Sequence, residues 1–187
     1  MTISRLLFAL VLLASCATAS AAERHFSLSS PAFRDDAPLP LKYAGGTLCG
    51  PDSKGGDMSP PLAWSNPPAG TKSFAVVMID PDGRRGLGSV HWVAYGIAPT
   101  RTGLREGEGD APSKEMTGGK NSRGTMLYTG PCGPPVDAPH HYVIDVIALD
   151  LAPDAVPAGL DRDQFLKAID GHSLGPASLV VRYRRAR

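Results

Sequence analysis

The sequence predicts a mainly β domain, a β-sandwich with a helical appendage near its C-terminus. Gly and Pro number 21 and 18 in a chain of 187 residues, and this content favours many turns and short strands. Several apolar segments have the length of strands, whereas only one late segment has helical periodicity. The length suits a single domain with a substantial core, which we place at residues 23–187.

Residues 1–22 have the layout of a secretory signal peptide. Arg5 precedes an apolar run from Leu6 to Leu13, and small residues with Ala-x-Ala spacing follow. The run is shorter than the roughly 20 residues that cross a bilayer. We therefore expect a periplasmic or secreted bacterial protein without a transmembrane segment. The stretch "LASC", ending at Cys16, also resembles a lipoprotein signal, so anchoring through a lipidated Cys16 is the alternative.

Export changes the expectation for the cysteines. Removal of the signal leaves Cys49 and Cys132, both in Gly/Pro-rich loops of a chain directed to an oxidising compartment. A disulfide between them would close a long loop and stabilise the fold by about 2–4 kcal/mol. We expect this disulfide, and two free thiols are the alternative.

Strands are expected in order along the chain. Alternation of apolar and polar residues over 25–33 predicts a first strand. Residues 35–45 predict a turn followed by a second strand. A long Gly/Pro/Ser-rich loop follows, with a short strand at 62–64. The apolar runs 73–80 and 90–97 have the length of strands buried on both faces, and "DPDG" between them is a turn signal.

The second half of the chain begins with a polar, Gly-rich segment over 98–130, where we expect a long surface excursion with little regular structure. A third central strand follows at 141–150. Residues 161–172 predict the one helix, with Asp161 as N-cap and Gly171 at its end. Alternation over 177–185 predicts the last strand.

Polar residues gather where the central strands end or begin. Asp80 and Asp82 follow one strand, His91 opens the next, and a Gly/Pro loop from Gly130 leads to His140 before the third. Because strand ends of a sandwich cluster at one rim, we expect these residues to meet there. Each also has a simpler interpretation, as a turn aspartate, a core histidine or a core aromatic.

Such a set suits a small anion or a zwitterion such as a phosphoethanolamine group. Histidine rings and loop N–H groups can donate to an anion, and an aspartate can fix the tautomer of a histidine. A second aspartate could meet a ligand ammonium. His140 and His141 face opposite sides of an extended strand, so only His140, which shares a face with Tyr142, is expected to point into the pocket.

Three segments in order carry a family resemblance: "DMSPPLAWSNPPAGTKSFAVVMIDPDG", "VHWVAYGI", and "GPCGPP" with "HHYVIDVIALD". From about Phe26 to its end the chain resembles the phosphatidylethanolamine-binding protein (PEBP) family, most closely the bacterial Raf-kinase-inhibitor-like branch. The resemblance implies a Greek-key sandwich with C-terminal helices and a pocket for phosphate-like groups. It implies as ligand-binding residues Asp80, Asp82, His91, Gly130, Pro131, His140 and Tyr142.

The chain departs from the family pattern around the mouth of this pocket. Arg84 stands where a proline is common, and Ser89 and Val90 stand where aromatics usually precede the His-Trp pair. His141 replaces a usual arginine, and Gly133 is an extra residue of the proline loop. We expect a mouth that is more open and more basic than usual.

The leading hypothesis is therefore an exported, non-enzymatic protein that binds a phosphate or a phosphorylated head group. The alternatives are a modulator of a protease, a kinase or an envelope protein, and an enzyme acting on phosphoesters, for which Asp and His could hold a metal or perform acid–base chemistry. We expect no catalytic residue, metal or cofactor. Nucleic-acid partners are excluded by a formal net charge of +1 without a basic block before the last residues.

Overall fold

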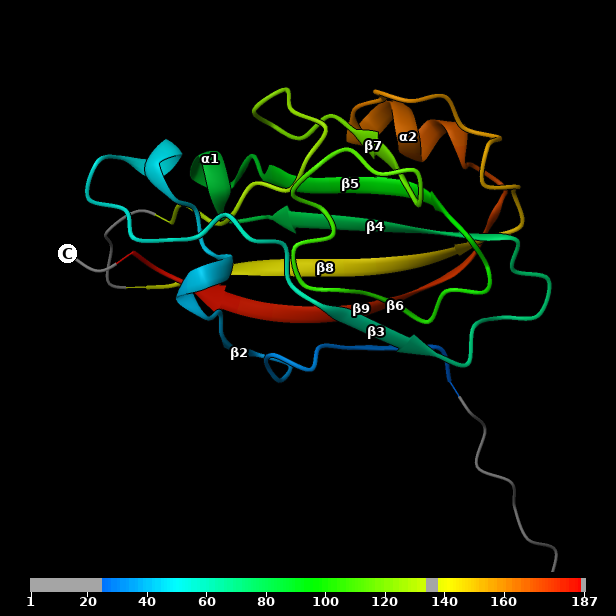
Figure 1. Cartoon of the computed structure of the whole chain (residues 1–187), viewed down its shortest axis with the longest axis horizontal. Helices are drawn as coiled ribbons and strands as arrows, with labels where there is room; N and C mark the ends of the chain where they lie inside the picture. Colours follow the sequence, from blue (N-terminus) through cyan, green and yellow to red (C-terminus); the bar gives the residue numbers. More distant parts are fainter. Residues whose placement is uncertain (1–24, 134–137, 186–187) are drawn as a thin grey trace, which may run out of the picture.

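The computed structural model describes residues 25–133 and 138–185, and the expected signal peptide lies outside these ranges. The described chain forms two β-sheets (Figure 1). The large sheet has the order β2-β9-β8-β4-β5-β7, and the small one has the order β1-β3-β6. The expectation of a mainly β fold with two sheets is confirmed.

The strands of the large sheet are β2 (Ala37–Pro38), β4 (Ser73–Asp80), β5 (Ser89–Ile97), β7 (Thr117–Gly119), β8 (His140–Leu149) and β9 (Ser173–Tyr183). The small sheet contains β1 (Ser27–Ser29), β3 (Leu62–Ser65) and β6 (Gly103–Leu104). The short helical elements are η1 (Leu41–Tyr43), η2 (Thr47–Cys49), α1 (Gly83–Gly86) and α2 (Arg162–Ala168).

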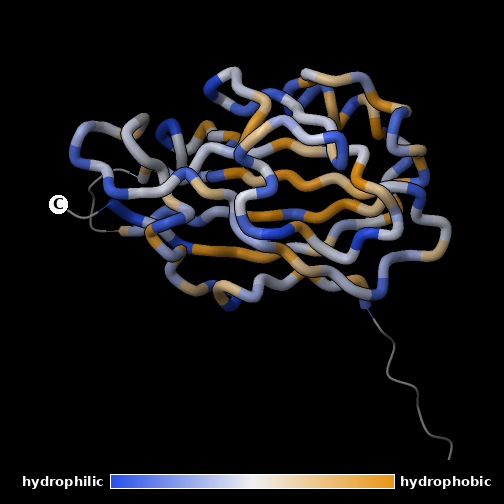
Figure 2. Tube along the Cα trace, viewed as in Figure 1, coloured by the Kyte–Doolittle hydropathy of each residue, from blue (hydrophilic) through white to orange (hydrophobic). Residues whose placement is uncertain are grey.

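Two apolar cores separate three layers. Alternate residues of β4 and β8, such as Val76, Met78 and Ile144, pack with Leu62 and Trp64 between the two sheets. This inner core and the central strands stand out as the apolar centre of the molecule in Figure 2. Helix α2 covers the opposite face of the large sheet. Because both faces are buried, the central strands are apolar throughout.

Helix α2 covers the outer face of the large sheet. Phe165 and Ile169 pack against Val77 and Tyr95, which confirms the helical stripe expected from the sequence. The helix starts at a capping box, in which the Asp161 side chain accepts from the Gln164 N–H and the Gln164 side chain accepts from the Asp161 N–H.

The segment 98–130 is more ordered than the sequence suggested. It contributes the short strands β6 and β7 and returns to the interior, where Asn121, Tyr128 and Thr129 are buried. The Asn121 side chain holds this return, since its amide donates to the Leu127 carbonyl and its oxygen accepts from the Arg123 N–H. Buried side-chain hydrogen bonds therefore replace regular structure here.

Candidate functional site

The end of β4 brings the predicted residues together. Strand β4 runs antiparallel to both β5 and β8, with Asp80 opposite Ser89 and Ile79 opposite Val143. The last residue of β4 therefore lies beside the first residues of both neighbours (Figure 1). Strand alternation puts Asp80 on the inner face with Met78, and His140 on the inner face with Tyr142.

His91 reaches this inner face through a β-bulge. Met78 is opposite Trp92 but Ile79 is opposite Val90, so His91 is an extra residue of β5. Regular alternation would place His91 with Val93 on the outer face. Instead Val90 packs on the outer core, and the His91 ring lies 5.2 Å from the Tyr142 ring, centroid to centroid. The bulge thus turns His91 toward Asp80 and His140.

The Asp80 carboxylate positions both a histidine and a loop. Its Oδ2 lies 2.9 Å from Nδ1 of His140, and its Oδ1 accepts from the Gly83 N–H at 2.8 Å. Only 4% of Asp80 is exposed. Because the carboxylate accepts through Oδ2, Nδ1 of His140 carries a hydrogen and its Nε2 is left to face a ligand.

His91 is buried, and its ring is held by a backbone carbonyl. Its Nδ1 lies 2.8 Å from the Thr129 carbonyl oxygen, which can only accept, so Nδ1 carries the hydrogen. Burial lowers the pKa of His91, while the Thr129 hydrogen bond and the charge of Asp80 act in the opposite direction. The ring is therefore neutral at neutral pH, and its Nε2 is an acceptor.

Tyr142 lies beneath these residues and is fully buried. Its hydroxyl has no hydrogen-bond partner among the described residues. Burial, followed by the nearby charge of Asp80, raises the pKa of Tyr142 well above its ordinary range, so the hydroxyl keeps its proton. The protonated hydroxyl lies close to the Asp80 carboxylate, below the residues that line the cavity.

These elements enclose a cavity of about 330 Å³, which we call the cup. Asp80, His91 and His140 line it together, as the sequence predicted. The cup is lined by Asp80, Gly83, Arg84, Ser89, Val90, His91, Ser122, Arg123, Thr129, Cys132, Gly133 and His140.

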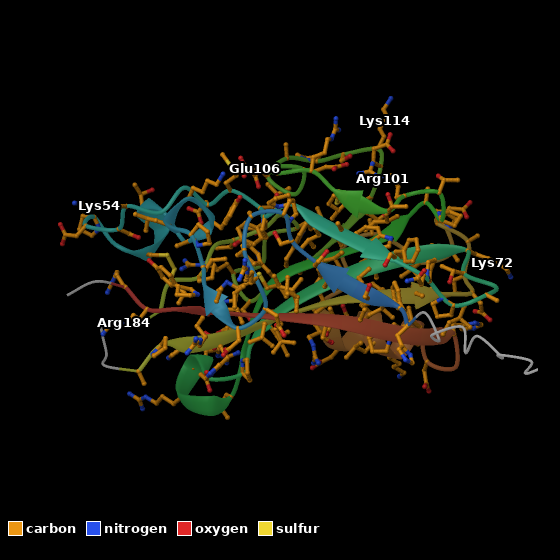
Figure 3. All side chains as sticks on the ribbon, turned by 90° about the horizontal axis from the view of Figure 1, so that it is seen from below. Lys54, Lys72, Arg101, Glu106, Lys114 and Arg184 are labelled. Carbon is orange, nitrogen blue, oxygen red and sulfur yellow. A yellow bond between two sulfur atoms is a disulfide. The ribbon has the colours of Figure 1, made fainter. Side chains whose placement is uncertain are left out.

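The departures from the family pattern lie at this cavity. Arg84, Ser89, Val90 and Gly133 all line it, so the mouth carries a guanidinium and small side chains. Arg123 adds a second guanidinium, which sequence reasoning missed because it lies in the polar segment 98–130. In Figure 3, Lys54 and Arg184 lie at the end of the molecule that carries α1 in Figure 1. The cations exceed the one carboxylate in the cup.

The expected disulfide is present between Cys49 and Cys132, whose Cα atoms are 5.2 Å apart. Cys132 lies in the wall of the cup, and a guanidinium nitrogen of Arg123 lies 2.9 Å from its Sγ. The bond packs against Gly45, where a Cβ would come within 2.0 Å of the Cys49 sulfur. The disulfide therefore fixes one wall of the cavity.

Asp82 and His141 do not line the cup. Asp82 Oδ2 accepts from the His141 N–H at 2.8 Å and lies 3.0 Å from its Nδ1, on the exposed side of β8. The backbone N–H bond and then the ring lower the pKa of Asp82. The expectation that Asp82 joins Asp80 in the pocket is wrong, because Asp82 has helical backbone angles and the extended segment ends at Asp80.

Gly130 and Pro131 support the wall without offering N–H groups to an anion, contrary to expectation. The Gly130 N–H donates to Asp57 at 3.0 Å, and proline has no N–H. The Pro131 carbonyl accepts from the Gly45 N–H at 2.8 Å. A Cβ on Gly130 would lie 2.4 Å from the Ala44 carbonyl carbon, so only glycine fits. The stiff loop is a structural support.

The described residues contain no group of three or more His, Cys, Asp or Glu side chains that could hold a metal ion. Within the same ranges, no helix has the length and apolarity needed to cross a bilayer. The arrangement is that of a small polar cup with the guanidinium groups of Arg84 and Arg123 as donors and two histidine rings in its wall.

Comparisons with known proteins agree with this architecture. Residues 29–184 match the family model described as phosphatidylethanolamine-binding protein. A UPF0098 protein of Methanothermobacter thermautotrophicus is 36% identical over 162 residues, covering 85% of this chain and 99% of its own. A protein of Mycobacterium tuberculosis named "Putative lipoprotein LppC" is 35% identical, covering 87% of this chain and 74% of its own.

Solved structures show the same fold. The crystal structure of YbcL from E. coli, described as a new member of the mammalian PEBP family, has a TM-score of 0.77 at 30% identity, covering 86% of this chain and 98% of its own. CT736 from Chlamydia trachomatis has a TM-score of 0.71 at 32% identity, covering 86% and 97%. The chain belongs to the phosphatidylethanolamine-binding protein family.

Proposed function

We propose that the chain is a non-enzymatic protein that binds a phosphate or a phosphorylated small molecule in the cup. The observation that carries this proposal is the balance of charge and hydrogen-bonding capacity there. The single carboxylate, Asp80, is already engaged by His140 and the Gly83 N–H. The guanidinium groups of Arg84 and Arg123 remain as donors in the wall of the cup, and such donors recognise anionic oxygens.

The hydrogen bonds of the two aspartates favour an anionic ligand over a zwitterionic one. A ligand ammonium would need a carboxylate facing it, but both predicted aspartates are already paired with histidines. Asp82 is also outside the cup. The zwitterionic head group expected from the sequence is therefore the weaker version of the proposal, and the phosphate group alone is the recognised feature.

A non-enzymatic role is supported by the absence of an activated nucleophile among the described cup residues. The hydroxyls of Ser89, Ser122 and Thr129 make no hydrogen bond to either histidine ring in the described structure. The Asp80–His140 pair therefore positions a ring and has no hydroxyl to deprotonate. Turnover of a generic phosphoester by the purified protein would contradict this part of the proposal.

Binding is tested by titrating inorganic phosphate into the mature protein and following heat and melting temperature. We expect phosphate to raise the melting temperature of the wild type. His140→Ala removes a side chain that lines the cup and leaves the Asp80 carboxylate without its partner, where it repels an anion, so binding should weaken about tenfold or more. His141→Ala, on the exposed side of the same strand, is the matched control and should bind like the wild type. No heat and no melting shift with any phosphate compound would refute the proposal.

We also propose that the protein acts outside the cytoplasm. The Cys49–Cys132 disulfide supports an oxidising compartment, and one relative carries a lipoprotein name. Cell fractionation with mass spectrometry of the mature N-terminus separates cleavage near residue 22 from lipidation at Cys16. An intact N-terminus in the cytoplasmic fraction would refute export.

A further inference from the structure

A second cavity, of about 440 Å³, adjoins the cup, and we call it the groove. It runs between the turn that follows β4, the segment around Lys120 and the start of α2. The two cavities lie side by side, and we call them together the cleft. They have five lining residues in common: Asp80, Arg84, Ser89, Val90 and Ser122. The combined size is that of a site for a small organic molecule, which exceeds what inorganic phosphate needs.

Two buried side-chain polar atoms of the described structure lack a hydrogen-bond partner, and one of them belongs to a residue that lines this cleft. One is the Tyr142 hydroxyl, beneath the cup, and the other is Nε of Arg162, a residue that lines the groove. A buried donor without a partner is costly, so a native protein seldom keeps one without a purpose. A ligand with an acceptor in the groove would satisfy the donor of Arg162.

Arg84 stands at the junction of the cup and the groove. Its backbone is left-handed (φ 51°, ψ 37°), a conformation that is unfavourable for a residue with a Cβ. The turn is held in place by the Gly83 N–H bond to Asp80 and by the Gly88 N–H bond to the Gly83 carbonyl. Arg84 lines both cavities, so its side chain can contact a phosphate in the cup and the group attached to it.

The groove has an apolar part and a positively charged part. Ile79, Leu87 and Val90 supply aliphatic contact, and Leu87 is 81% exposed. Lys120 and Arg162 supply positive charge at the far side. Of the acidic residues there, Asp161 caps its own helix and Asp163 is paired with Arg162 Nη1 at 3.4 Å, so Nε of Arg162 is left for a ligand.

We propose that the cleft binds a phosphate ester whose carbon chain lies along the groove and ends in a carboxylate facing Arg162 and Lys120. This inference rests on the proposed phosphate site and names the ligand class that the site takes. Arg162 and Lys120 are specificity-determining residues for the distal end, and Leu87 and Val90 contact the carbon chain.

The test uses two series of probes and one variant pair on the mature protein. The probes are inorganic phosphate, n-alkyl phosphates, and ω-carboxyalkyl phosphates of matched lengths. Affinity should rise with chain length, and at the best length the carboxylated ester should bind about tenfold or more tighter than the plain ester. Arg162→Gln should remove that extra affinity and leave inorganic phosphate binding unchanged. Lys167→Gln, an exposed cation on the same helix outside the groove, should change neither.

The outcomes separate this inference from the proposal on which it rests. If inorganic phosphate binds but esters bind no tighter, or if Arg162→Gln weakens all probes equally, the groove is not a subsite and the cup remains. If no phosphate compound binds, both are wrong. If the plain esters gain affinity and the carboxylate adds nothing, the assignment to Arg162 is overturned.

Discussion

Asp80 and His140, 60 residues apart in sequence, form a buried pair with 2.9 Å between Oδ2 and Nδ1. The other oxygen of Asp80 holds the Gly83 N–H. One carboxylate therefore fixes a histidine ring in the wall of the cup and the turn that carries Arg84. A second pair, Asp82 with His141, is similar in chemistry but exposed, and this gives a natural comparison within the same molecule.

Substituting the two aspartates should separate the two pairs. Asp80→Asn leaves at least one buried donor without its carboxylate partner, so we expect the free energy of unfolding to fall by about 1–3 kcal/mol. Asp82→Asn changes an exposed pair and should cost less than about 1 kcal/mol. Urea denaturation at pH 7 measures both. Equal costs would mean that Asp80 does not hold the cup together.

The left-handed turn gives a second matched pair. Arg84 and Arg85 both have positive φ, but only Arg84 lines the cup. Glycine relieves the steric cost of this conformation, so Arg84→Gly and Arg85→Gly should each match or exceed wild-type stability, by up to about 1 kcal/mol. Arg84→Gly alone should weaken phosphate binding several-fold, because it removes a cation from the cavity. Equal binding by the two variants would remove Arg84 from the site.

His91 should make the fold sensitive to mild acid. Its pKa is lowered by burial in the folded protein, whereas the unfolded chain keeps an ordinary value near 6.5. Stability should therefore be full above about pH 6.5 and decline as the pH falls through the lowered value, because protonation favours the unfolded chain. Urea midpoints between pH 7.5 and 5 should show this decline in the wild type. In His91→Asn the slope should be smaller, and identical slopes would contradict the assignment.

The disulfide should affect both stability and binding. It links cysteines separated by 83 positions, and closing a loop of that length is worth about 4.5 kcal/mol in the chain-entropy model. The double variant Cys49→Ala, Cys132→Ala should lose about that much stability and should bind phosphate more weakly, since Cys132 is part of the cup wall. Reductant should weaken binding by the wild type and leave the double variant unchanged. Wild-type affinity in the double variant would show that the wall does not depend on the bond.

Much of the framework follows from local sequence patterns. The strand expected at Ser73–Asp80 has those bounds, and the strands near 90–97 and 141–150 begin one residue earlier than expected. Their apolar runs are long because both faces are covered, one by the small sheet and one by α2. The helix begins where Asp161 supplies the cap. In each case the signal lies within about ten consecutive residues, so it can be read without the fold.

The sequence by itself determined the class of fold, the central strands, the late helix and the approach of Asp80 and His140 at one rim, whereas a β-bulge in the folded sheet decided that His91 joins them. Tertiary structure alone decided that Gly130 gives its N–H to Asp57, that Asp82 turns outward to His141, and that Arg123 joins the cup. The physical reason is that periodicity fixes which face of a strand a side chain occupies. Which of several nearby groups takes a given hydrogen bond depends on bulges, turns and loop returns that are set by packing across the whole domain.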